Sequence, residues 1–239
     1  MGKVGDGIAA SNANWTFAGD VAATFDDHVS KSVPLYNEGH DLICALSDFF
    51  VKPGSTVYEI GSSTGTLTFK LAKRNAGKAG VNFIGIDVEA NMVAKAQEKA
   101  KAGGFKNTQF SIDDVVTMEF EPSDLVVAYY TVQFIRPSVR QMLIDKIYNS
   151  LHWGGAFVMF EKVRGPDARF QDISTSMYHD YKLERGYSPD EIVSKARSLK
   201  GVLEPFSSQG NIDLMKRAGF SDIMSIQKYI CFEGTVAIK

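Results

Sequence analysis

The sequence contains 239 residues, with 26 Lys and Arg against 28 Asp and Glu and a formal net charge of −2. Hydrophobic residues make up 44% of it, which is typical of a globular protein built as one large domain or two small ones. This composition excludes a largely disordered chain, and no apolar run approaches the roughly 20 residues of a membrane-spanning helix. The near-neutral charge argues against a direct nucleic-acid partner, which would require a basic face.

The N-terminal segment and the cysteines indicate a cytoplasmic protein. Residues 1–14 are small and polar with no apolar core, which predicts a flexible N-terminus rather than a signal peptide. Cys44 and Cys231 are too few for a disulfide framework and lack the spacing of metal ligands. We therefore expect a reducing compartment and no metal site.

The remaining residues, 15–239, have the pattern of a single α/β domain. Apolar strands alternate with amphipathic helices, which predicts a mostly parallel sheet covered on both faces. Helices are predicted at 20–31, 36–50, 64–75, 89–102, 137–151, 170–183, 189–199 and 211–218, and strands at 56–60, 82–87, 108–112, 124–129, 155–161, 221–229 and 232–238. The last two strands form an expected antiparallel pair, giving a seven-stranded sheet with an antiparallel last strand. Residues 15–50 and 165–200 are expected to form a helical cap.

A glycine-rich turn follows the first predicted strand and opens the next helix. Its candidate ligand-binding residues are Glu59, Gly61, Ser62, Ser63 and Gly65. Gly61 permits close approach of the backbone to a ligand, and Gly65 lets the helix begin tight against the sheet. Ligands of open α/β sheets bind outside the carboxyl ends of the strands, where this loop lies. A turn with no ligand remains an alternative.

Acidic residues end the next two strands at the same edge of the sheet. Asp87 follows Gly65 by about twenty residues, which suits hydrogen bonding to ribose hydroxyls, although such an acid is often only a helix N-cap. Asp113 and Asp114 end the third strand. Together with Glu59, these make three acidic strand ends at one edge, and with the glycine-rich loop they favour a cofactor that carries adenosine.

The spacing within the loop argues against a dinucleotide. A pyrophosphate site needs the pattern G-x-G-x-x-G, whereas here Ser63 stands between Gly61 and Gly65. The Glu59 carboxylate would repel two phosphates and would attract an amino group or a sulfonium. The loop resembles the S-adenosylmethionine loop of class I methyltransferases, so the predicted fold is the Rossmann-like fold of that superfamily. A nicotinamide-dependent oxidoreductase is a less favoured alternative.

Several further segments resemble a narrower family, the carboxy-S-adenosylmethionine synthases. The similarity runs in consistent order from about residue 14 to the end of the chain. The segments are Trp15-Thr16-Phe17, Ser32-Val33-Pro34 with Tyr36, residues 131–137 with Gln133-Phe134, residues 145–148, residues 154–156, Glu161-Lys162, Met177 with His179-Asp180-Tyr181-Lys182, residues 186–188 and residues 216–220. Each motif alone is common, but the set is specific.

The resemblance implies an activity and a set of contacts. Enzymes of this family are homodimers that use prephenate as a carboxyl donor and convert S-adenosylmethionine to its carboxylated form. A separate enzyme uses that product to modify the wobble uridine of certain tRNAs. The positions that match the family's contacts for S-adenosylmethionine, or for carboxy-S-adenosylmethionine, are Tyr36, Gly61, Ser62, Ser63, Asp87, Val88, Asp114 and Val115.

Two positions depart from the family pattern. Tyr129 stands where the family has an Asn that contacts the cofactor. The family's carboxylate-holding Arg, lent by the neighbouring subunit, aligns with Ala196, and Arg197 follows it. One residue rotates a helical side chain by about 100°, so Arg197 is a candidate clamp only if the helix is offset. Otherwise the chain is a methyltransferase for a small molecule, a relative with a different clamp, or a non-catalytic binding protein.

The remaining candidates are aromatic residues and one histidine. His179, beside Asp180, is a candidate general base or a structural residue. Trp15 and Phe17 either close the pocket or anchor the N-terminal segment. Of the adjacent pair at the end of the fourth strand, Tyr129 and Tyr130, one is expected to face the core.

Overall fold

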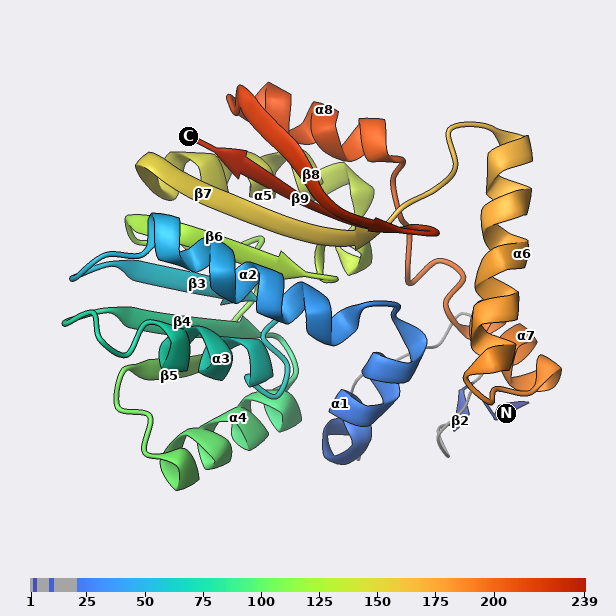
Figure 1. Cartoon of the computed structure of the whole chain (residues 1–239), viewed down its shortest axis with the longest axis horizontal. Helices are drawn as coiled ribbons and strands as arrows, with labels where there is room; N and C mark the ends of the chain where they lie inside the picture. Colours follow the sequence, from blue (N-terminus) through green and yellow to red (C-terminus); the bar gives the residue numbers. More distant parts are fainter. Residues whose placement is uncertain (1, 4–8, 11–20) are drawn as a thin grey trace.

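The computed structural model describes residues 2–3, 9–10 and 21–239, shown in Figure 1. Trp15 and Phe17 lie outside the described residues. The helices are α1 (Val21–Ser32), α2 (Tyr36–Phe50), α3 (Thr66–Arg74), α4 (Ala90–Gly103), α5 (Pro137–Ser150), α6 (Ala168–Glu184), α7 (Pro189–Ser198) and α8 (Ser208–Ala218), with a 3-10 turn, η1, at Val132–Phe134. The strands are β1 (Gly2–Lys3), β2 (Ala9–Ala10), β3 (Thr56–Ile60), β4 (Asn82–Asp87), β5 (Thr108–Ile112), β6 (Ser123–Tyr129), β7 (Leu151–Lys162), β8 (Asp222–Tyr229) and β9 (Phe232–Ile238).

One seven-stranded sheet organises the domain. Its strand order is β5-β4-β3-β6-β7-β9-β8, and the five strands from β5 to β7 are parallel. The last strand of the chain, β9, is antiparallel to both of its neighbours. The predicted α/β fold, a mostly parallel seven-stranded sheet in which the last strand of the chain is antiparallel, is therefore confirmed.

Helices cover both faces of this sheet because side chains alternate along each strand. Val57 of β3 points to the face covered by α2 and α3, where it joins Ile43 and Leu67 in one core. Tyr58 points to the opposite face, where α5 and α8 contribute Leu143 and Leu214. The central strand β6 is buried along its whole length, and its residues 125–128 are all apolar because helices cover both faces of the sheet (Figure 1).

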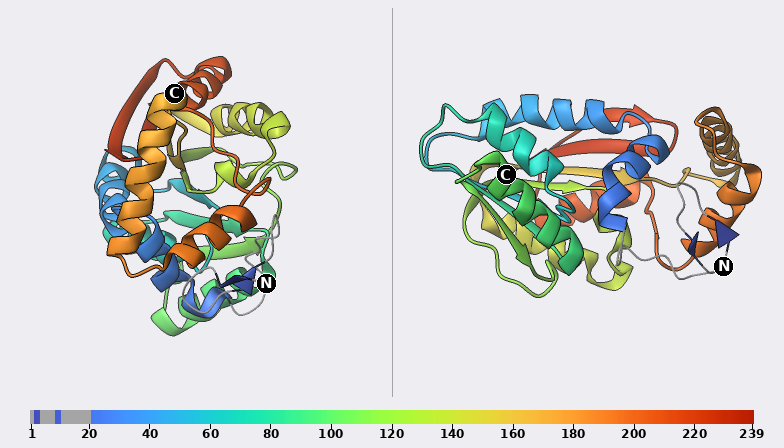
Figure 2. Two further views of the ribbon diagram at one scale, coloured as in Figure 1. Left: turned by 90° about the vertical axis from the view of Figure 1, so that its right-hand side faces the viewer. Right: turned by 90° about the horizontal axis from the view of Figure 1, so that it is seen from below.

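Three helices form a cap beyond the carboxyl ends of the parallel strands. Figure 2 shows α6 and α7 standing away from the sheet, with α1 between them and the sheet. Ser32 at the end of α1 joins the three helices: its carbonyl accepts a hydrogen bond from Tyr178 Oη of α6 at 2.8 Å, and its hydroxyl accepts one from Lys195 Nζ of α7 at 2.8 Å. The cap therefore packs as a unit.

The structure corrects the predicted extent of the cap. Helix α2, included in the predicted cap segment 15–50, packs on the sheet because its apolar stripe is buried there. Of the predicted flexible segment 1–14, the structure describes only β1 and β2, which pair with each other. The described residues include no helix long and apolar enough to cross a membrane.

Candidate functional site

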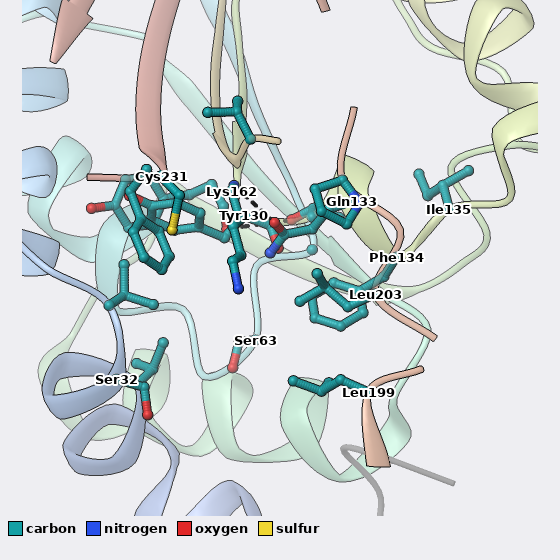
Figure 3. Close-up of a pocket in the computed structure, with 18 of the residues that line it drawn as sticks. Ser32, Ser63, Tyr130, Gln133, Phe134, Ile135, Lys162, Leu199, Leu203 and Cys231 are labelled. Carbon is teal, nitrogen blue, oxygen red and sulfur yellow. Dashed lines mark hydrogen bonds between the residues drawn. The ribbon is translucent and has the colours of Figure 1, made fainter. Parts of the chain in front are cut away.

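A cavity of about 1060 Å³ lies between the carboxyl ends of the strands and the cap, and Figure 3 shows part of its wall. The predicted site residues that line it are Tyr36, Gly61, Ser63, Asp87, Val88, Asp113, Asp114, Val115 and Tyr129. The predicted residues that do not line it are Glu59, Ser62, Gly65 and Arg197. Most of the predicted site residues therefore line the cavity, and the structure shows which of the others lie behind its wall.

Gly61 turns the chain at the end of β3. Its φ is +70°, and its N–H donates to the Ile86 carbonyl at 2.7 Å. A Cβ at this position would overlap the Thr131 side chain, lying 2.5 Å from Cγ2 and closer still to Oγ1. Thr131 is fixed because Oγ1 donates to the Ile60 carbonyl at 2.9 Å. Only glycine fits both the backbone conformation and the space.

Asp87 holds the loop and begins the next helix. One of its oxygens accepts a hydrogen bond from Ser63 N–H at 2.8 Å, and the other accepts one from Glu89 N–H at 2.9 Å. Ser63 has a φ of +50°, so this bond stabilises a strained residue on the cavity wall. Burial raises the pKa of Asp87. A carboxylate has about four acceptor positions, so these backbone bonds leave capacity for a ligand hydroxyl.

Asp113 and Asp114 follow β5 at the neighbouring strand end. Both side chains are exposed and line the cavity, and the adjacent Val115 is buried. Asp113 Oδ1 accepts a hydrogen bond from Asp114 N–H, and Asp114 Oδ1 accepts one from Val116 N–H, both at 2.9 Å. These bonds fix a turn that presents carboxylates and backbone groups together.

Glu59, expected to face the ligand, points into the protein instead. It is 5% exposed, and its carboxyl accepts a hydrogen bond from Thr68 Oγ1 of α3. Burial raises its pKa from 4.5 to about 8, so at neutral pH it is protonated and carries no charge toward the cavity. The expectation that this carboxylate attracts a sulfonium is therefore wrong in its physical reason.

We expect Glu59→Gln to make the protein more resistant to alkaline pH. The folded state keeps the Glu59 proton up to about pH 8, whereas the unfolded chain releases it near 4.5, so this group's contribution to stability falls as pH rises between these values. The glutamine side chain keeps the hydrogen bond to Thr68, and the free energy of unfolding of the variant should exceed that of wild type by about 1–3 kcal/mol at pH 8.5. Urea unfolding at pH 5.5 and 8.5 measures this. A tenfold loss of S-adenosylmethionine affinity in Glu59→Gln would instead restore Glu59 as a ligand contact.

Two further loop residues are structural. Gly65 caps α3 with a φ of +78°, and a Cβ there would lie 2.7 Å from the Phe110 ring. Ser62 is 3% exposed, and its backbone N–H donates to the Ile86 carbonyl at 2.9 Å. Both let α3 start against the sheet, as predicted for Gly65, but neither faces the cavity.

Tyrosines form the wall at the end of β6. Tyr129 Oη donates to the Tyr36 carbonyl at 2.6 Å, so the residue at the family's Asn position ties β6 to α2. Tyr130 has a φ of +60°, a conformation that L-residues rarely adopt and that places both adjacent tyrosines against the cavity. Tyr129 also packs in the core, with its ring centre 4.6 Å from that of His40 and 4.9 Å from that of Phe160, so the expectation that one of the pair faces the core is met by Tyr129.

The cap wall contains one predicted candidate and several residues that sequence reasoning missed. His179 lines the cavity half-buried, and burial lowers its pKa. Ala196 lines it, whereas Arg197 is exposed and does not. Lys162 and Lys182 also line it. They belong to segments of family resemblance, but lysines are usually solvated, so nothing in the sequence marked them as buried.

Comparisons with known proteins agree with this geometry. Residues 51–215 match a family model described as a methyltransferase domain. A carboxy-S-adenosyl-L-methionine synthase of Staphylococcus epidermidis is 37% identical over 94% of this chain and 97% of its own length. One from Nautilia profundicola is 39% identical over 93% of this chain and 94% of its own length.

Solved structures share the fold. A SAM-dependent methyltransferase from Aquifex aeolicus superposes with a TM-score of 0.60 at 16% identity, over 91% of this chain and 97% of that one. The alignments with the two synthases cover nearly the whole length of each chain, which confirms the resemblance predicted from the motifs. The chain belongs to the carboxy-S-adenosyl-L-methionine synthase family, a group of S-adenosylmethionine-dependent enzymes with a methyltransferase domain.

Proposed function

We propose that this protein carboxylates S-adenosylmethionine, moving a carboxyl group from a small anionic donor to the methyl carbon of the sulfonium. The observation that carries the proposal is the cavity of about 1060 Å³, which has the glycine-rich loop and the acidic strand ends on one side. Ligand pockets are commonly about 300–1,000 Å³, so this one has room for a donor beside the cofactor.

The acidic strand ends are the proposed site for the nucleoside. Asp87 would accept hydrogen bonds from the ribose hydroxyls, and Asp113, Asp114 and Val115 would surround the base. The backbone at Gly61 and Ser63 would approach the methionine portion. The other lining residues predicted as contacts are Tyr36, Val88 and Tyr129.

The family resemblance identifies the proposed donor and the fate of the product. Prephenate is the proposed donor: it loses carbon dioxide and hydroxide to become phenylpyruvate, the hydroxide takes a proton from the methyl group, and the methyl carbon takes up the carbon dioxide. The carboxylated product would serve a separate enzyme that modifies the tRNA wobble uridine. The cytoplasm, where the thiols of Cys44 and Cys231 stay reduced, is the proposed location.

A homodimer is the proposed assembly. Phe170, Ile173 and Met177 lie three and four residues apart on α6 and are about half exposed, which leaves an apolar stripe on the cap. A second copy would cover this stripe. Arg197 on the same cap does not face its own cavity, so it can hold a carboxylate only across such an interface. Sedimentation at micromolar concentration measures the dimer.

Transfer of an unmodified methyl group is the second candidate function. It is favoured by Ala196, an uncharged residue at the position where the family has the arginine that one subunit lends to its neighbour. In that case the cavity would hold a small acceptor molecule in line with the methyl group. Binding without turnover is the third outcome that the following experiment separates.

The test is mass spectrometry of the ligand released from the purified, denatured protein, followed by incubation with S-adenosylmethionine and prephenate. We expect a ligand heavier than S-adenosylmethionine by one carboxyl group. Asp87→Asn should weaken S-adenosylmethionine binding about 10–100-fold, because it removes a charged acceptor. Asp124→Asn is the matched control, because Asp124 lies at the end of β6 that is far from the cavity, and this variant should bind S-adenosylmethionine normally.

Each other result contradicts the proposal in a different way. Plain S-adenosylmethionine or its demethylated product, with no carboxylated product after incubation, indicates methyl transfer. A bound ligand that no acceptor or donor consumes indicates a binding protein. Normal affinity in Asp87→Asn would remove the ribose contact assigned to this residue.

A further inference from the structure

Charge is divided between the two walls of the cavity. The carboxylate side chains that line the cavity all lie at or just after the ends of β4 and β5: Asp87, Glu89, Asp113 and Asp114. No described lining residue before position 130 is Lys or Arg. Beyond position 130 the described lining holds six cationic side chains and no carboxylate: Arg136, Lys162, Arg164, Lys182, Lys195 and Lys200. The acidic lining residues therefore lie at the ends of β4 and β5, whereas Lys162 and Lys182 lie at the end of β7 and in α6.

Two of these lysines approach the same aromatic ring. Lys162 Nζ at the end of β7 lies 4.6 Å from the centre of the Tyr178 ring, and Lys182 Nζ in the last turn of α6 lies 4.3 Å from that centre. Lys182 is 6% exposed, and Figure 3 shows the Lys162 side chain extending from β7 into the cavity. Among the side chains that the structure describes, neither ammonium has a carboxylate within 4.0 Å.

This arrangement is costly without a ligand. Burial and the charge of Lys162 lower the pKa of Lys182 from 10.5 to about 8, and burial lowers the pKa of Lys162 as well. The Tyr178 ring offsets part of the cost through cation–π contact, and the C-terminal dipole of α6 favours a cation at Lys182. These effects stabilise one buried ammonium group, but they do not offset the repulsion from a second ammonium group near the same ring. A bound anion that contacts both ammonium groups would offset that repulsion.

Gln133 fixes the backbone from which one of the lysines extends. Its amide oxygen accepts a hydrogen bond from Lys162 N–H at 2.9 Å, and its amide nitrogen donates to the Tyr130 carbonyl at 3.2 Å. Gln133 is 4% exposed, so the bond to Lys162 is protected from water (Figure 3). The backbone position of Lys162 is thus fixed before any ligand binds.

We propose that Lys162 and Lys182 together bind a carboxylate group of the second substrate. Ammonium groups bind carboxylates through short, charge-assisted hydrogen bonds, and two of them on different elements can take both oxygens. The inference rests on the proposed function, because that function assigns the acidic wall to the nucleoside and leaves the basic wall to the second molecule. The pair supplies positive charge within the chain, whereas Ala196 supplies none.

The test is calorimetric titration of the full chain with succinate, a simple dicarboxylate, and with its uncharged diamide, each with and without saturating S-adenosylmethionine. We expect wild type to bind succinate and not the diamide. Lys162→Met and Lys182→Met keep the unbranched side chain but remove the ammonium group, and each should weaken succinate binding at least about tenfold. The double variant should lose it, while S-adenosylmethionine affinity stays unchanged.

Lys73→Met is the matched control, because Lys73 lies 5.6 Å from the Phe105 ring on the outer helix α3 and does not line the cavity. Lys162→Arg, which keeps the charge, should retain most of the binding. Equal succinate affinity in wild type and the double variant would overturn the proposal, as would a wild type that binds S-adenosylmethionine but not succinate. A wild type that binds succinate but not S-adenosylmethionine would contradict the proposed function instead.

Discussion

Gly61→Ala is expected to weaken S-adenosylmethionine binding by at least about 100-fold, because it displaces the loop that would hold the methionine portion. The alanine side chain meets Thr131 at the end of β6, and its backbone must hold a φ of +70°. Strain of this backbone conformation and displacement of Thr131 together lower the free energy of unfolding by about 2–4 kcal/mol. Calorimetry with S-adenosylmethionine and urea unfolding measure the two effects.

Gly54→Ala provides a matched control for the backbone term. Gly54 has a φ of +83°, but nothing lies within 4 Å of a Cβ built there, so the expected loss is about 1 kcal/mol with normal binding. Thr131→Ala in the Gly61→Ala background removes the two closest contacts and should recover part of the affinity. If Gly61→Ala and Gly54→Ala behave alike, the contact with Thr131 has no role in binding.

Arg140→Met is expected to cost about 3–5 kcal/mol of stability, the largest effect of a single substitution that we predict. Arg140 is 1% exposed, and its guanidinium donates to the Ile135 carbonyl at 2.8 Å and to the Gln133 carbonyl at 3.1 Å. Methionine leaves the Ile135 carbonyl without its donor, whereas the Gln133 carbonyl keeps the Glu204 N–H at 2.9 Å. It also removes the positive charge that opposes the burial of Glu161, a carboxyl 3% exposed.

The loss in Arg140→Met should grow with pH. Burial raises the pKa of Glu161 from 4.5 to about 8, and the Arg140 charge limits that rise. Without this charge the carboxyl stays protonated to higher pH in the folded state, so stability continues to fall as pH rises beyond 8. Urea unfolding at pH 6 and 8.5 measures the difference.

Two further variants test the origin of that loss. Arg140→Met/Glu161→Gln should recover part of it at pH 8.5, because the unpaired carboxyl is gone. Arg136→Met, at the exposed N-cap residue of the same helix, should stay within about 0.5 kcal/mol of wild type. A double variant no more stable than Arg140→Met would show that Glu161 does not depend on the arginine.

Local patterns in the sequence were sufficient for the elements and for one wall of the cavity. The strand 56–60 and the helix 36–50 match β3 and α2 residue for residue, because apolar spacing alone distinguishes a buried strand from an amphipathic helix. Asp87 and Asp113 were found because parallel strands bring their carboxyl ends to one edge. These inferences need only neighbours in sequence and one rule of topology.

The orientation of side chains within the loop was not available from sequence. Glu59 and Gly61 are two residues apart, yet Glu59 is buried beside α3 and Gly61 lines the cavity, because Glu59 is still in β3 on the face that α3 covers whereas the chain leaves the strand at Gly61 with a φ of +70°. Tyr130 faces the cavity for the same kind of reason. A positive φ at a residue other than glycine leaves little mark in a sequence.

The sequence by itself determined the sheet, the glycine-rich loop, the acidic strand ends and the family, since each depends on a local pattern or on motif order. Tertiary structure decided which charges face the ligand. Lys162 and Lys182 come from β7 and α6, and only the docking of the cap places them beside Tyr178 opposite the acidic wall. A charge is assigned to a site by burial and by its neighbours in space, and residues far apart in the chain supply both.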